Sequence, residues 1–318
     1  MMEDSYTPSF LNPITTTIGE KMVLSPDDWS RIMHPEDKST IEAMEALPGF
    51  SSLMKMILSG YHEKYMKVKL MGNGIKLSEK QLPEYYKQLL FVCEKLRIEH
   101  IPDFYLVAEP IPNAFSIGET DPIIMVTTRL MQNLTSEDLQ TVLAHECGHI
   151  LFKHQRYTLL ALALTMGLET ALGHFAAMAT MGGLTVLKQC VFRWLRMSEL
   201  SADRVAVLFM GSSIKSARVV MRGLGPETVL KDMDPEAYYS QIDEYADMLS
   251  TKKYEEILNN LSLWNEEHPP HAYRVMQMRE FSKTQLFRTM ARKLGTFCCP
   301  KCGAAMQTQN ICVNGHML

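Results

Sequence analysis

Apolar side chains recur at helical spacing along most of this chain. In residues 136–153 they form a stripe of the kind that a helix buries against a core, made of Leu139, Val142, Leu143, Ile150 and Leu151. Helical patterns also cover residues 81–96, 214–266 and 272–294. These patterns predict a protein that is mainly α-helical.

Two short runs, residues 104–108 and 123–128, are instead rich in β-branched and aromatic residues, which is typical of strands. Prolines and a glycine between the two runs predict an irregular connection. Residues 113–116 within that connection are compatible with a further extended segment. We therefore expect a small β-sheet among the helices, which is an α+β fold.

The patterns divide the chain into three regions. Residues 1–80 contain helix starts, at 25–29 and 34–37, that are separated by turns, and we expect a helical N-terminal region there. Residues 81–285 carry the strands and the most regular helices and form the expected main domain. Residues 296–318 form a short cysteine-rich tail.

Composition narrows the class of protein. Hydrophobic residues make up 46% of the chain, which supports a real core, and the net charge of −4 leaves no broad basic surface for nucleic acid. The odd number of cysteines, seven, fits a reducing compartment and metal binding better than a disulfide framework. The acidic start of the sequence lacks the apolar run of a signal peptide, so we expect a cytoplasmic protein.

The strongest chemical signal is the sequence His145-Glu146-Cys147-Gly148-His149. Two histidines four residues apart lie on one face of a helix, so both imidazoles can reach one metal ion. The glutamate between them is placed to take a proton from a metal-bound water. This His-Glu-x-x-His arrangement is that of zinc peptidases. The alternative, a surface helix with incidental histidines, conflicts with the apolar stripe around the motif.

A catalytic zinc needs three protein ligands and one open position for water. Glu199 and Asp203, again four residues apart on a predicted helix, supply a candidate third ligand and a hydrogen-bond acceptor. Glu199 would bind the metal with His145 and His149, and Asp203 would accept a hydrogen bond from the second ring nitrogen of a ligand histidine. Taken alone, the pair could equally be an ordinary acidic helix face.

Four motifs in order resemble the HtpX and CAAX prenyl protease family of zinc metallopeptidases. They are Pro112–Phe115 with Val126–Leu130, Val142–Ala144 leading into the His-Glu motif, Glu199–Asp203, and His268-Pro269-Pro270 with Arg274. The resemblance covers roughly residues 80–282. It implies a gluzincin-like zinc metallopeptidase core for the region 81–285.

The resemblance also implies roles for residues outside the helix motifs. In that family the histidine matching His268 lies near the zinc, where it donates to the developing oxyanion or acts as a reversible fourth ligand. A helix-start histidine bonded to the backbone is the alternative. Arg274 belongs to the same late motif and is expected behind the metal ligands. Asn113, Ala114 and Phe115 would line the substrate cleft, where an extended peptide adds to a sheet edge as a strand.

Residues 158–187 are almost entirely apolar. If Glu199 meets His145 and His149, the chain between them cannot cross a bilayer an odd number of times, and two crossings need roughly 40 apolar residues. This segment is too short for that, so we predict a helical hairpin that covers the core or makes peripheral contact with a membrane surface. A short, distorted transmembrane hairpin stays open.

The tail resembles a zinc ribbon. Cys299 and Cys302 have Cys-x-x-Cys spacing, and Cys312 and His316 can complete a four-ligand, closed, structural zinc site. Cys298 competes with Cys299 for the first position. A reduced tail without a metal is the alternative.

These patterns together predict a zinc-dependent metalloendopeptidase with one catalytic Zn²⁺ and a second, structural Zn²⁺. Glu146 is the expected general base, His268 the expected second catalytic residue, and peptides or proteins the expected substrates. The resemblance suggests a role in protein quality control. The alternative function is a catalytically weak chaperone-like or scaffolding protein that acts through the zinc ribbon.

Overall fold

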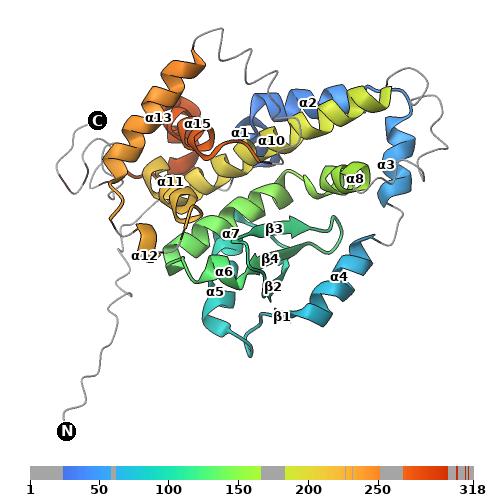
Figure 1. Cartoon of the computed structure of the whole chain (residues 1–318), viewed down its shortest axis with the longest axis horizontal. Coiled ribbons are helices and arrows are strands. Elements are labelled where there is room, and N and C mark those ends of the chain that lie inside the picture. Colours follow the sequence, from blue (N-terminus) through green and yellow to red (C-terminus); the bar gives the residue numbers. More distant parts are fainter. Residues whose placement is uncertain are drawn as a thin grey trace.

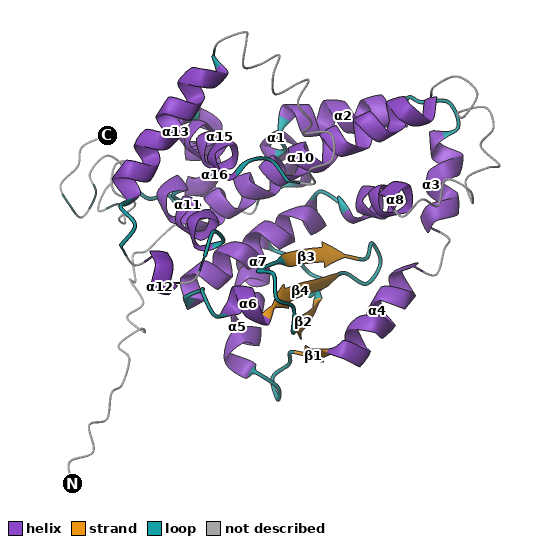
Figure 2. Ribbon diagram, viewed as in Figure 1, coloured by secondary structure: helices purple, strands orange, loops and turns teal. Residues whose placement is uncertain are grey.

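The computed structural model describes residues 24–58, 62–165, 183–225, 227–230, 232–250 and 268–299, together with Met306, Cys312 and Asn314. Helices make up most of the described residues, and a four-stranded sheet lies among them (Figures 1 and 2). The prediction of a mainly helical α+β protein is therefore confirmed.

The elements follow the order of the predicted regions. Before and around the sheet lie α1 (Pro26–Ile32), α2 (Pro35–Glu45), α3 (Phe50–Leu58), α4 (His62–Asn73), β1 (Gly74–Lys76), α5 (Pro83–Leu96), β2 (Asp103–Val107), β3 (Ala114–Ile117) and β4 (Ile123–Thr127). After it lie α6 (Thr128–Met131), α7 (Ser136–Leu151), α8 (Gln155–Thr165), α10 (Gly183–Met210), α11 (Ser213–Arg222), α12 (Glu227–Leu230), α13 (Pro235–Leu249), α15 (His271–Lys283) and α16 (Gln285–Lys293).

The sheet has the strand order β1-β2-β4-β3, and only the β2–β4 pair is parallel. Strand β4 is buried on both faces, which explains its uninterrupted apolar sequence. Ile124 and Val126 face a core shared with α5 and α7, whereas Ile123 and Met125 face a second core shared with α3 and α8. The sheet thus separates two apolar cores, and β3 lies at its edge.

Helices α7 and α10 pack closely against each other, and α10 also contacts α2 on another side. Helix α7 begins with a capping box, in which Thr135 and Asp138 exchange side-chain and backbone hydrogen bonds. Gly148 lets the two helices approach, because a Cβ at this position would lie 3.0 Å from the Cα of Ala202. The glycine of the His-Glu motif is therefore a packing residue.

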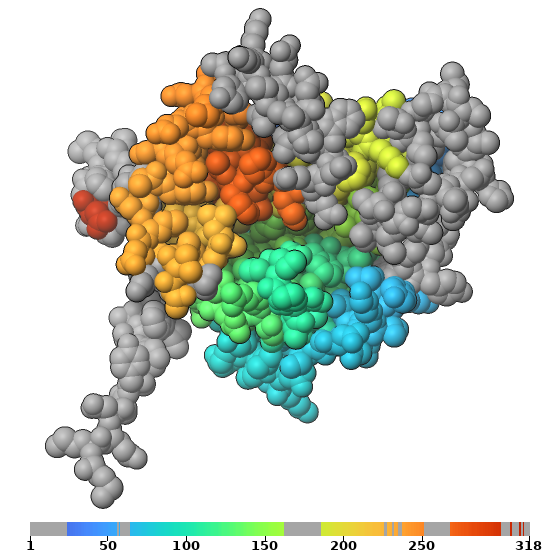
Figure 3. Space-filling model, viewed as in Figure 1, coloured from blue at the N-terminus to red at the C-terminus, as the bar shows by residue number. Residues whose placement is uncertain are grey.

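Two features of the fold differ from or add to the sequence predictions. The single helix predicted for residues 272–294 is wrong: Thr284 is extended, and α15 and α16 meet there. The N-terminal region also contributes β1, which pairs with β2. In the space-filling view, the sheet region and the helices α11, α13 and α15 form two neighbouring areas of one face of the molecule (Figure 3).

The apolar segment 158–187 is only partly described. Its first residues belong to α8 and its last to α10, and the predicted hairpin falls mainly on residues 166–182, which lie outside the described residues. Among the helices that are described, none is long and apolar enough to cross a membrane.

Candidate metal centre

Helices α7 and α10 bring the three predicted ligands together. The Nε2 atoms of His145 and His149 lie 3.3 Å apart. Each is 3.4 Å from a different carboxylate oxygen of Glu199, Oε2 for His145 and Oε1 for His149. In the described part of the chain, these residues form the group able to hold a metal ion, with ligand atoms within 4.8 Å of one another.

The spacing of these groups suits a zinc ion. With Zn–N and Zn–O bonds of about 2.0–2.1 Å, the edges of a tetrahedron are roughly 3.3–3.4 Å long. The two nitrogens are one such edge apart, and each lies at a similar distance from one of the two oxygens of the Glu199 carboxylate. Two imidazoles and a carboxylate are ligands that zinc accepts. Three such ligands would leave the fourth position of a zinc ion for water or substrate.

Asp203 and Arg274 hold His145 and Glu199 from behind. The Nδ1 of His145 lies 3.0 Å from Oδ1 of Asp203, so its hydrogen is donated to the carboxylate and Nε2 keeps a free lone pair. Arg274 donates from Nε and Nη2 to the two oxygens of Asp203, at 2.9 and 2.6 Å. Its Nη1 also lies 3.3 Å from Oε2 of Glu199. The structure therefore brings Asp203 and Arg274 to the predicted centre.

The buried charges of the centre are mutually compensated. Burial alone would raise the pKa of Glu199, but the charge of Arg274 and contacts with three histidines hold this pKa well below its usual range. Burial opposes ionisation of Asp203 as well, and the same guanidinium lowers its pKa. For His145, burial opposes protonation, yet the two carboxylates raise the pKa to about 10. The field that draws a proton to His145 also favours a divalent cation.

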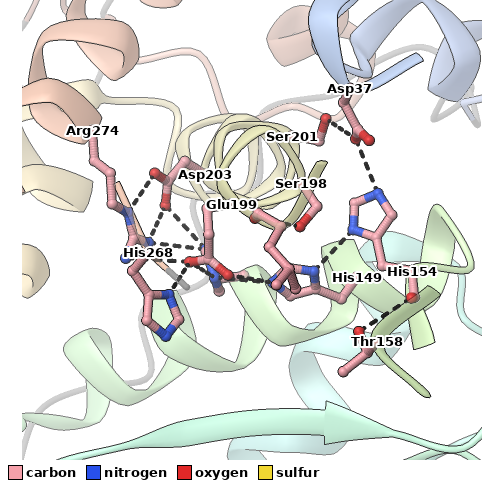
Figure 4. Close-up of polar contacts among 12 residues, drawn as sticks. Asp37, His149, His154, Thr158, Ser198, Glu199, Ser201, Asp203, His268 and Arg274 are labelled. Atoms are coloured by element: carbon pink, nitrogen blue, oxygen red, sulfur yellow. Dashed lines mark hydrogen bonds and ion pairs between the residues drawn. The ribbon is translucent and has the colours of Figure 1, made fainter. Parts of the chain in front are cut away.

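The two predicted catalytic residues differ in exposure. Glu146 is buried, with 4% of its surface exposed, on α7 between the two histidines. His268 lies just before α15, with its Nδ1 3.2 Å from Oε2 of Glu199 and 56% of its side chain exposed. Contact with Glu199 raises the pKa of His268. The centre is therefore reached by solvent on the side of His268, whose ring lies beside Glu199 in Figure 4.

The residues expected in the substrate cleft lie at the edge of the sheet. Ala114 and Phe115 are the first residues of β3. Just before them, the carbonyl of Asn113 accepts a hydrogen bond from the N–H of Thr127, and the N–H of Asn113 donates to Oγ1 of Thr127, at 2.9 Å each. Strand β3 contacts α7, the helix of the two histidines. This part of the sheet is thus next to the helix that carries His145 and His149.

The predicted structural zinc site is only partly within the described residues. Cys299 and Cys312 are fully buried, and Cys312 forms a β-bridge with Met306. Cys302 and His316 lie outside the described residues.

Sequence reasoning missed a second set of residues at the centre. Nδ1 of His149 lies 2.9 Å from Nδ1 of His154, and Nε2 of His154 lies 3.0 Å from Oδ2 of Asp37 (Figure 4). His154 is buried beside His149, although nothing in its sequence spacing marks it. No motif marked Asp37, which stands near the start of a predicted N-terminal helix.

Comparisons with known proteins agree with this geometry. The family model described as Peptidase family M48 matches residues 77–282. The plastoglobule-localized metallopeptidase 48 of Arabidopsis thaliana chloroplasts is 30% identical over 265 residues, which are 82% of this chain and 74% of that protein. No solved structure matches.

Bacterial relatives match a shorter part of the chain. The protease HtpX homologue of Helicobacter pylori strain Shi470 is 32% identical over 115 residues, 36% of this chain and 34% of that protein. The homologue of Thermodesulfovibrio yellowstonii is 32% identical over 116 residues, 36% of this chain and 39% of that protein. These alignments thus cover little more than a third of either HtpX homologue.

Proposed function

Because the chain belongs to peptidase family M48, we propose that its peptidase chemistry takes place at the centre formed by His145, His149 and Glu199. Membership confirms the HtpX-like resemblance and the zinc-dependent peptidase function predicted from the motifs. The observation that carries the proposed site is the convergence of the two imidazole Nε2 atoms, 3.3 Å apart, on the carboxylate of Glu199, with each nitrogen 3.4 Å from one of its oxygens.

His145, His149 and Glu199 would hold the zinc ion, which would supply Lewis acidity and lower the pKa of a bound water toward neutrality. Glu146 is the general base that takes the proton of the attacking water and later passes it to the leaving amine. It stands on α7 directly after one ligand residue and three residues before the other. Burial of Glu146 limits competition from bulk water.

His268 is the candidate for stabilising the oxyanion that forms when the peptide carbonyl is attacked. Its ring lies beside Glu199 on the exposed side of the centre, and its raised pKa favours the doubly protonated, donating form. Asp203 and Arg274 do not touch substrate in this proposal. They hold His145 and Glu199 in position.

Peptides or proteins are the proposed substrates, bound in extended form along β3. Within an antiparallel pair, alternate residues direct their main-chain groups away from the partner strand. Because the backbones of Asn113 and Thr127 are hydrogen-bonded, Ala114 and Ser116 direct theirs away from β4. A bound peptide would pair with these groups as an added strand.

Two further parts of the proposal concern the rest of the chain. A structural zinc in the tail, held by Cys299, Cys302, Cys312 and His316, is supported by ligand spacing and by the burial of Cys299 and Cys312. A cytoplasmic location is also part of the proposal, and the apolar sequence of 158–187 supports peripheral membrane contact through that segment.

The test of the catalytic assignment is the variant Glu146→Gln. The side chain keeps its size but cannot take a proton, so peptide turnover should fall by about 10²–10⁴-fold while zinc content stays unchanged. Glu137→Gln is a matched control, because Glu137 lies on the same helix and pairs with Lys215 at the surface. Equal turnover of Glu146→Gln and wild type would refute the mechanism.

A further inference from the structure

A buried hydrogen-bonded chain joins the N-terminal helix α2 to a metal ligand. It runs from Asp37 of α2 through His154 to Nδ1 of His149, with separations of 3.0 and 2.9 Å (Figure 4). Asp37 lies outside residues 77–282, the part that matches the family. We propose that Asp37, acting through His154, is a positioning residue that sets the tautomer and orientation of His149 for metal binding. This inference rests on the proposed function.

The backbone after α7 places His154 against His149. Lys153 adopts φ of +57°, in the left-handed region that an ordinary residue seldom occupies. This reversal brings the backbone N–H of His154 to the carbonyl of His149, at 2.9 Å. The turn at the end of α7 thereby places His154 next to His149.

The packing of α2 against α10 places Asp37 at the other end of the chain. Ser201 of α10 donates from Oγ to Oδ2 of Asp37 at 2.5 Å, and its oxygen accepts from the backbone N–H of His34 at 2.9 Å. Burial opposes ionisation of Asp37, but contacts with His154 and Ser201 outweigh it and lower its pKa. Asp37 therefore acts as a carboxylate that accepts hydrogen bonds.

The order of donors and acceptors follows from that carboxylate. Oδ2 of Asp37 has no hydrogen to give, so Nε2 of His154 carries one and donates it. Only one hydrogen fits between the two facing Nδ1 atoms, and with Nε2 of His154 already donating, its Nδ1 accepts the Nδ1 hydrogen of His149. The remaining nitrogen of His149, Nε2, keeps its lone pair, and this is the atom that faces Glu199 and His145.

Both histidine ligands are thus anchored through Nδ1 to a buried carboxylate. For His145 the contact with Asp203 is direct, whereas for His149 the ring of His154 stands between ligand and carboxylate. Water has little access to this second chain, because Asp37 is 0% exposed and His154 is 1% exposed. In such surroundings hydrogen bonds are strong and an unpaired partner is costly. The N-terminal region therefore contributes to the metal centre without touching the metal.

The test compares the zinc affinity of two His154 variants in the full-length protein. His154→Phe keeps an aromatic ring beside Phe152 and Trp194 but removes the relay. His154→Gln restores it, because one amide can accept from His149 through its oxygen and donate to Asp37 through its nitrogen. By competition with a chelator, the zinc dissociation constant should rise about 10–100-fold for the Phe variant and stay within about threefold for the Gln variant.

A purely structural role is separated by a second variant. His154→Phe alone leaves the carboxylate of Asp37 buried without its histidine partner, which should lower stability. The double variant Asp37→Leu/His154→Phe removes both polar groups, so its stability against urea, measured in EDTA, should be higher than that of His154→Phe. We expect its zinc affinity to stay weak. Recovery of wild-type affinity together with stability would overturn the positioning role. Asp28→Asn, which removes a buried carboxylate that pairs with Lys293, is the matched control and should leave zinc affinity unchanged.

The remaining outcomes separate this inference from the proposed centre. His149→Ala defines how much zinc belongs to any other site. If wild type and His149→Ala bind zinc equally, the proposed metal centre itself fails. Suppose that wild type binds zinc tightly. If His154→Phe then binds zinc as tightly as wild type, or if His154→Gln binds zinc as weakly as His154→Phe, only the positioning role is overturned.

Discussion

The contact between α7 and α10 at Gly148 offers a sharp test of how the metal centre is held. A Cβ at position 148 would lie 3.0 Å from the Cα of Ala202 and 3.2 Å from the Cβ and Cγ2 of Val205. Two of these three atoms are fixed to the backbone of α10, so a side-chain rotation relieves only the third. In Gly148→Ala the helices must therefore move apart by a few tenths of an ångström.

Two opposing terms decide the size of the effect. Overpacking of a well-packed core costs about 1–3 kcal/mol, whereas alanine in place of a helical glycine gains roughly 0.5–1 kcal/mol. Gly72→Ala in α4 measures the gain alone, because a Cβ there meets nothing within 4 Å. The free energy of unfolding of Gly148→Ala should thus be lower than that of Gly72→Ala by about 1–3 kcal/mol.

The displacement should also reach the ligands. Glu199 stands one helical turn before Ala202 on α10, so moving α10 draws its carboxylate away from His145 and His149. We expect weaker zinc binding by Gly148→Ala, measured by chelator competition, and unchanged binding by Gly72→Ala. Urea unfolding in EDTA gives the stability term separately. If the two alanine variants unfold at the same urea concentration and bind zinc equally, the close packing of α7 on α10 is refuted.

Two further predictions concern the sheet edge and the N-terminal region. Ala114→Pro removes a backbone N–H that points away from β4, so kcat/KM for peptides should fall about 3–10-fold while the zinc content stays unchanged. Ala114→Val keeps this N–H and should retain activity. An unaltered kcat/KM in the proline variant would contradict strand addition. Burial, with a contribution from Arg204, lowers the pKa of His34 from 6.5 to about 4, so the unfolded chain binds a proton first as the pH falls. The free energy of unfolding should therefore drop by up to about 3 kcal/mol between pH 6.5 and 4. His34→Asn keeps a side chain able to cap α2 but should lose this contribution to the pH dependence. If the free energies of unfolding of wild type and His34→Asn change in parallel with pH, the assignment to His34 is excluded.

Sequence patterns predicted the parts of the centre that lie within single helices. His145 and His149 are one turn apart on α7, and Glu199 and Asp203 are one turn apart on α10, so each pair follows from the helical period. The period cannot say that these two helices meet. That step came from the family resemblance, and the contact at Gly148 supplies its physical basis.

The strands were predicted well for a similar reason. The run Ile123–Thr127 is apolar throughout because both faces of β4 are buried, and propensity and burial agree there. The division at Thr284 was missed because the apolar spacing continues from α15 into α16. The break is visible only in the structure, where the backbone of Thr284 is extended and its side chain caps the N-terminus of α16.

The chain from Asp37 to His149 could not be predicted from the sequence, and the reason is physical. Asp37 and His154 are 117 positions apart, and Asp37 and Ser201 are 164 apart, so no local period relates them. Asp37 also lies outside the matched family region, so the resemblance gives no help. The contact exists because α10 packs on both α2 and α7: its Glu199 meets the histidines of α7, and its Ser201 holds the carboxylate of α2. A change in the packing of α2 should therefore alter zinc affinity through Asp37, even though no atom of α2 is a metal ligand.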